Sequence, residues 1–136
     1  MTELTKQCLN LPFDRRARLA KILNESLFKG EDIATRRFYI LLPIAENLVG
    51  VGVLDKTKDI ELVIGRRMIA YQMRSEGYSF PSIGKMMVRH HASVIHMVRM
   101  MEDALHYQFD LEVGYWNLFQ QKILEYDIHS RTTQGS

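Results

Sequence analysis

The sequence predicts an all-α protein built around a helix-turn-helix, and two observations carry this prediction. Apolar residues recur every three or four positions through most of the chain, and no segment alternates convincingly as a β-strand. The stretch from Ser79 to Arg99 reads as a short helix, a tight turn and a second helix that opens with Arg, His and Ser side chains. Such side chains at a helix N-terminus are suited to hydrogen-bond with phosphates and base edges in the DNA major groove.

The first third of the chain predicts two helices. One begins near Asp14 and ends at Gly30, and its apolar stripe consists of Leu19, Ile22, Leu23 and Leu27. A second covers residues 34–49, where Pro43 predicts a break or a kink. Residues 54–58 then form a short basic loop.

The middle third predicts the three helices that matter for function. A long helix covers residues 59–76 and stops at Gly77, with its arginines largely outside the apolar stripe. Ser79 is the expected N-cap of a short helix. The next helix starts at His90 or His91, and its core stripe consists of Val94, Val98, Met101 and Leu105.

The last third predicts one amphipathic helix over residues 111–128. It carries Trp116, Tyr115 and Phe119, which we assign either to the core or to a dimer interface. The polar tail, residues 130–136, is expected to be disordered.

Charge is distributed unevenly along the chain. Residues 56–102 carry eight Lys or Arg against four Asp or Glu, whereas residues 103–136 carry two against five. The basic third coincides with the helix-turn-helix, which favours a polyanionic partner. A solvated basic face without a ligand is the alternative.

Three segments of the chain carry a resemblance to a known family. Arg66–Tyr71, Ser79–Gly84 and Val88–Val94 resemble, in the same order, the motifs of the C-terminal DNA-binding domain of the bacterial replication initiator DnaA. Upstream, residues 44–51 and 54–58 resemble that family's first helix and basic loop. His90 stands where the family's signature has Asp, and Ala92 where it has Thr.

The resemblance implies a fold and a division of the chain. The fold is a helix-turn-helix bundle of the DnaA C-terminal or Trp-repressor-like type, with extra helices at both ends. Residues 1–38 would be an N-terminal helical extension and residues 39–107 the helix-turn-helix domain. Residues 108–129 would be a C-terminal helix and residues 130–136 the tail.

The resemblance also implies which residues meet DNA. Signature residues would read major-groove bases, Arg66 or Arg67 would approach the minor groove or the backbone, and the loop lysines would bind phosphates. The predicted DNA-binding set is Lys56, Lys58, Arg66, Arg67, Ser79, Lys85, Arg89, His90, His91, Ala92, Ser93, His96 and Arg99. For His91, a helix-capping or buried structural role remains an alternative.

Other functional classes are disfavoured by the sequence. No G-x-x-x-x-G-K-[ST] loop occurs, so no nucleotide is implied, and no convergent catalytic group suggests an enzyme. The histidines at positions 90, 91 and 96 lack the i, i+4 spacing of a helical metal pair, so we expect neither a metal nor another cofactor. The single cysteine, Cys8, and the lack of a long apolar run predict a cytoplasmic protein with no membrane partner.

Two functions follow as hypotheses. The first is double-stranded DNA binding, as a small regulator or an accessory replication or mobile-element protein. The alternative, motivated by His90, Ala92 and the acidic C-terminal helix, is a helical protein-interaction module that kept the fold but lost sequence-specific DNA binding. A homo-oligomer formed through the C-terminal helix stays open.

Overall fold

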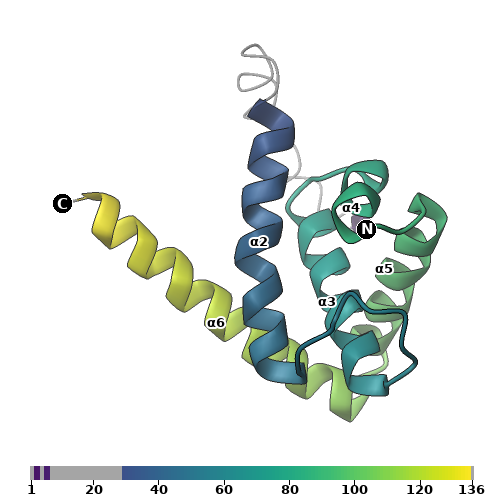
Figure 1. Ribbon diagram of the computed structural model, residues 1–136. Helices are drawn as coiled ribbons and strands as arrows, with labels where there is room; N and C mark the ends of the chain where they lie inside the picture. The colour runs from purple at the N-terminus through teal and green to yellow at the C-terminus, as the bar shows by residue number, and fades with distance from the viewer. Residues whose placement is uncertain (1, 4, 7–28, 136) are drawn as a thin grey trace.

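The computed structural model describes residues 2–3, 5–6 and 29–135, with side chains described for residues 33–131. The described residues form five α-helices: α2 (Lys29–Val49), α3 (Ile60–Ser75), α4 (Phe80–Met87), α5 (His91–His106) and α6 (Asp110–Gly135). Two strands of two residues each, β1 (Thr2–Glu3) and β2 (Thr5–Lys6), pair in parallel. The all-α prediction is confirmed, because most of the described residues are helical (Figure 1).

Helix α3 is the centre of the bundle. Figure 1 shows it between α2 and α5, with α4 at one end and α6 crossing α2 at the other. Gly65 allows α2 and α3 to approach closely, since a Cβ there would lie 2.7 Å from Cγ2 of Val49. The fully buried side chains with the largest volumes are Phe38, Phe119, Leu41, Ile64, Met68, Ile69, Met73, Ile83, Met87, Met101, Val53 and Val94.

Helix α2 packs on the bundle on both sides of the predicted boundary between residues 38 and 39. Its buried stripe has i, i+4, i+7, i+11 spacing and consists of Ala34, Phe38, Leu41 and Ala45. The stripe runs across the predicted boundary, so Ala34 and Phe38 are part of the core. The predicted helix before residue 29 lies outside the described residues.

Gly30 predicts a helix end and Pro43 a break or a kink, but α2 runs through both positions. Gly30 lies in the first turn of α2 instead of ending a helix, and Pro43 lies inside α2 without breaking it. Pro43 is exposed, so its ring faces solvent, and only one helical N–H is lost at that position. The buried stripe of α2 outweighs both local signals.

Helix α6 is longer than predicted, since it continues from Asp110 to Gly135 through the tail expected to be disordered. The polar residues of that tail include no proline, so nothing in their chemistry stops the helix. The first half of α6 packs on the bundle: Phe119 is fully buried, and Trp116 meets Tyr71 edge-to-face at 5.3 Å. Of the two roles left open for the α6 aromatics, Phe119 has the core one.

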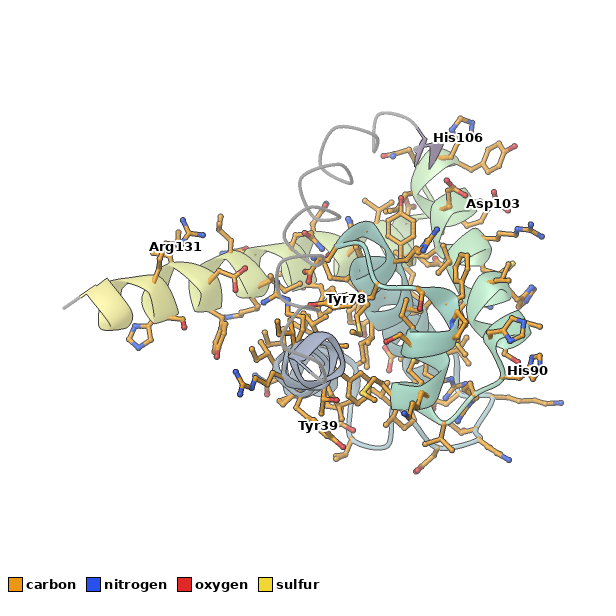
Figure 2. All side chains as sticks on the ribbon, turned by 90° about the horizontal axis from the view of Figure 1, so that it is seen from above. Tyr39, Tyr78, His90, Asp103, His106 and Arg131 are labelled. Atoms are coloured by element: carbon orange, nitrogen blue, oxygen red, sulfur yellow. The ribbon has the colours of Figure 1, made fainter. Side chains whose placement is uncertain are left out.

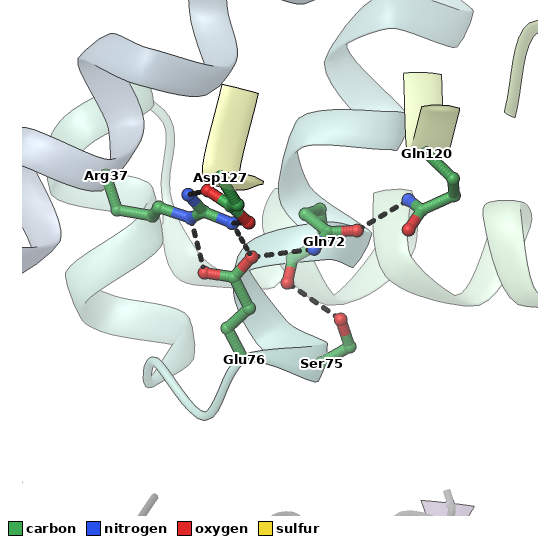
Figure 3. Close-up of polar contacts among 6 residues, drawn as sticks. All are labelled: Arg37, Gln72, Ser75, Glu76, Gln120 and Asp127. Carbon is green, nitrogen blue, oxygen red and sulfur yellow. Dashed lines mark hydrogen bonds and ion pairs between the residues drawn. The ribbon is translucent and has the colours of Figure 1, made fainter. Parts of the chain in front are cut away.

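A polar network joins α2, α3 and α6 (Figure 3). Arg37 on α2 pairs with Glu76 just after α3 at 2.8 Å and with Asp127 on α6 at 3.0 Å. Gln72 donates to Glu76 at 2.6 Å and accepts from Gln120 at 2.7 Å. The network fixes α6 against the two helices that carry most of the core.

Candidate nucleic-acid interface

Helices α4 and α5 form the predicted helix-turn-helix. Ser79 caps α4, because its Oγ accepts a hydrogen bond from the Ser82 N–H at 3.2 Å. Val88 ends α4 in the left-handed conformation, with φ 57°. At Gly84 the turn passes so close that an added Cβ would lie 2.5 Å from the carbonyl oxygen of Arg89. Glycine at position 84 therefore allows this close approach.

His90 is the N-cap of α5. Its Nδ1 accepts a hydrogen bond from the Ala92 N–H at 3.1 Å, and its ring stacks on the His91 ring at 4.3 Å. The ring nitrogen of His90 thus supplies the acceptor that Ser, Thr, Asp or Asn more often provides at an N-cap. The capping role left open for His91 belongs to His90, while His91 is exposed.

Most of the predicted set lies on the exposed side of this motif. Figure 2 labels His90 at the edge of the molecule that α5 borders. The core stripe of α5 is confirmed at Val94, Val98 and Met101, with Ala104 buried and Leu105 partly buried. The opposite side of α5 is exposed. Within α4, α5 and the residues that cap them, the exposed members of the set are Ser79, Lys85, His90, His91, Ala92, Ser93, His96 and Arg99.

Arg66, which is predicted to approach the minor groove or the backbone, is buried in this structure. It is 8% exposed and lies under the loop that follows α2. Its Nη1 donates to the carbonyl oxygens of Val53 at 2.9 Å and Asp55 at 2.7 Å, and its Nη2 donates to that of Thr57 at 2.7 Å. These backbone acceptors make its burial tolerable.

Arg89 also faces this loop, although the sequence predicted it at the major groove. Its Nη2 donates to the carbonyl oxygens of Leu54 at 2.8 Å and Asp55 at 3.3 Å. Its Nη1 donates to the carbonyl oxygens of Met87 and Val88, both at 3.3 Å. The guanidinium thus bridges the helix-turn-helix turn and the basic loop.

The surroundings of Arg66 are strongly positive. Burial lowers its pKa, and the charges of Arg89 and Arg67 lower it further, while Asp55 acts in the opposite direction. Arginine stays protonated in proteins, so the charges persist. Arg67 is half-buried, whereas Lys56 and Lys58 are exposed on the loop above this cluster.

Two contacts of the site had no signal in the sequence. One is the set of loop carbonyls that accept from Arg66 and Arg89, since backbone acceptors leave no residue pattern. The other is the position of Arg74 at the end of α3, whose guanidinium lies 4.4 Å from the ring centre of Phe80 in α4. Burial lowers the pKa of Arg74. This contact holds α4 against α3.

The described residues contain no group of three or more His, Cys, Asp or Glu side chains that could hold a metal ion. Among the helices of the described part, none is both long and apolar enough to cross a bilayer. Comparison of the chain with known proteins gave no matching family model, curated protein or solved structure.

Proposed function

We propose that the protein binds double-stranded DNA through α4 and α5, with the start of α5 in the major groove. The exposed side of α5 offers hydrogen-bonding side chains on its first three turns, including Ser93, His96 and Arg99. The methyl group of Ala92, also exposed, suits contact with a thymine methyl. The resemblance of the motif sequence to the DnaA C-terminal domain supports the same docking geometry.

The observation that carries the proposal is the contact between the basic loop and the turn before α5. Arg89 hydrogen-bonds to Leu54 and Asp55, directly before Lys56. Lysines that bind phosphate and side chains that reach base edges must lie on one face to serve the same duplex. Arg89 connects the two segments at hydrogen-bond distance. Within this activity, a small regulator or an accessory factor of replication or of a mobile element is the role that we favour.

A fluorescence anisotropy titration with a labelled duplex tests the proposal. We expect binding that weakens as salt rises, because loop and helix cations release counterions from the phosphates. Selection from random duplexes should then enrich one motif, read through α5. The proposal fails if the full chain binds no duplex at low salt.

A different surface favours the second candidate, a protein-interaction module. At the corner between α5 and α6, Tyr107 is 65% exposed and Phe109 is 48% exposed, and their rings stack at 6.2 Å. Leu111 and Leu118 add exposed apolar side chains at the start of α6. Aromatic side chains of this kind are frequent anchors of protein interfaces.

This second candidate predicts self-association or a partner complex that is lost in the Phe109→Ser variant. The matched control is Tyr39→Ser, which changes an exposed aromatic residue elsewhere, on α2. Sedimentation velocity measures the oligomeric state. A monomer that binds DNA tightly contradicts this candidate.

A further inference from the structure

We propose that Arg66 and Arg89 are positioning residues that fix the loop over residues 53–58 as a phosphate clamp, and that neither contacts DNA itself. This inference rests on the proposed function. It names the sugar-phosphate backbone as the part of the duplex that the loop recognises, through Lys56 and Lys58. It also removes Arg89 from the residues that read bases.

Four carbonyl groups of the loop accept hydrogen bonds from the two arginines that lie beneath it. The carbonyl oxygens of Val53, Leu54, Asp55 and Thr57 all accept from one of the two guanidinium groups. The Asp55 carbonyl accepts from both, at 2.7 Å from Arg66 and 3.3 Å from Arg89. A backbone held at four residues has little freedom, so the loop is set before a ligand arrives.

The two arginines come from different elements of the fold. Arg66 belongs to α3, the central helix, and Arg89 belongs to the turn before α5. The two arginines therefore fix the position of the loop relative to both the bundle core and the start of α5. Lys56 lies between the held carbonyls of Asp55 and Thr57, so its position relative to α5 is fixed.

The charges around the loop also bear on the ligand that it binds. The charges of Arg89 and Arg67 both act unfavourably on the charged Arg66, and Asp55 offsets them in part. Two exposed lysines on the loop add to the positive charge. A phosphate above the loop would offset this repulsion, whereas a neutral base edge would not. The cluster thus suits an anion better than a base.

The test is the Arg89→Lys variant. Lysine keeps the positive charge but lacks the planar fork that reaches two sites at once, so it separates charge from positioning. We measure duplex affinity across about 50–200 mM salt for the wild type, Arg89→Lys, Lys56→Ala/Lys58→Ala and the combination. Lys122→Ala/Arg131→Ala, which removes two exposed cations from α6, is the control.

We expect Arg89→Lys to weaken binding roughly tenfold and to lower the salt slope as the double lysine variant does, by up to about 1.8. When Arg89→Lys is added to the double lysine variant, it should change affinity less than about twofold, because the lysine side chains that Arg89 positions are already absent. Hydrogen exchange of the loop amides should quicken in Arg89→Lys while circular dichroism stays unchanged.

Three results are decisive. Wild-type affinity in Arg89→Lys overturns the inference, because charge alone would then suffice. Equal losses from Arg89→Lys in both backgrounds also overturn it, since they indicate a direct contact. If the wild type binds no duplex, the proposed function is contradicted. In that case hydrogen exchange still tests the positioning role, which is contradicted if the loop amides of Arg89→Lys exchange as slowly as those of the wild type.

Discussion

The guanidinium of Arg37 donates two parallel hydrogen bonds to the carboxylate of Glu76, from Nε to Oε1 and from Nη2 to Oε2, both at 2.8 Å. The same guanidinium reaches Asp127 at 3.0 Å. Burial alone would lower the pKa of Arg37, but its hydrogen bonds and charge interactions with both carboxylates outweigh burial and raise it. Three helices are thereby tied at one cation.

We expect Arg37→Ala to lower the free energy of unfolding by about 2 kcal/mol. The substitution leaves two half-buried carboxylates without their cation, which costs less than a fully buried pair because solvent screens them in part. Urea denaturation measures the effect. Arg36→Ala, at the exposed neighbouring position, should stay within about 0.5 kcal/mol of the wild type. Equal stability of the two variants would contradict the role of the network.

Gly84→Ala should destabilise the protein by about 2 kcal/mol or more. The new Cβ would lie 2.5 Å from the Arg89 carbonyl oxygen, and backbone cannot yield as a side chain can. Gly114→Ala is the matched control, since nothing lies within 4 Å of its Cβ. In helix α6 that change should stabilise by about 0.5–1 kcal/mol. Thermal denaturation of both variants should therefore shift in opposite directions.

Val88→Gly should stabilise the protein by roughly 1 kcal/mol. A β-branched residue at φ 57° is strained, and glycine adopts this conformation without a Cβ penalty. The gain is reduced by the greater freedom of glycine in the unfolded chain. A fall in the denaturation midpoint would show that the Val88 side chain makes compensating contacts.

His90→Ala should cost about 1 kcal/mol, because α5 loses the acceptor for the Ala92 N–H. His90→Asn supplies another good N-cap and should retain most of the stability. Chemical denaturation distinguishes the two variants. If both lose the same amount, the stacked His91 ring, not the cap, is what His90 stabilises.

Tyr115 predicts a dependence on alkaline pH. Its hydroxyl donates to Glu61 at 2.7 Å, and this hydrogen bond, followed by burial and the charges of Glu61 and Asp59, raises its pKa. A raised folded-state pKa contributes stability that is present below the unfolded value of about 10 and is lost as pH rises through the folded value.

The difference in unfolding free energy between the wild type and Tyr115→Phe should therefore shrink above about pH 10. The control for general alkaline effects is Tyr39→Phe, which removes the hydroxyl group of an exposed tyrosine on α2. A difference that stays constant with pH would contradict the hydrogen bond to Glu61.

Local chemistry explains what could be predicted from the sequence. The starts of α3, α4 and α5 carry N-caps at Asp59, Ser79 and His90, and each cap acts within three residues of itself. The buried stripe of α5 follows from its periodicity in the same way. The all-α class and the helix-turn-helix elements depend only on such short-range patterns.

Longer-range contacts explain what could not be predicted. An arginine such as Arg66 is expected from its charge to be solvent-exposed or to face DNA. Only the folded loop, nine to thirteen residues away in sequence, supplies the carbonyl oxygens that accept its hydrogen bonds when it is buried. Arg89 bonds to backbone 35 residues away. Gly30 predicts a helix end and Pro43 a break or a kink from local propensity, but the tertiary packing of α2 carries the helix through both positions.

The pairing of Arg37 with Asp127 spans 90 positions of the chain. During synthesis on the ribosome, α2 emerges long before the carboxylate that completes its cation site. The bundle of α2 to α5 must therefore remain without this tie until Asp127 has left the exit tunnel. We therefore expect α2 to α5 to assemble before α6 is secured against them.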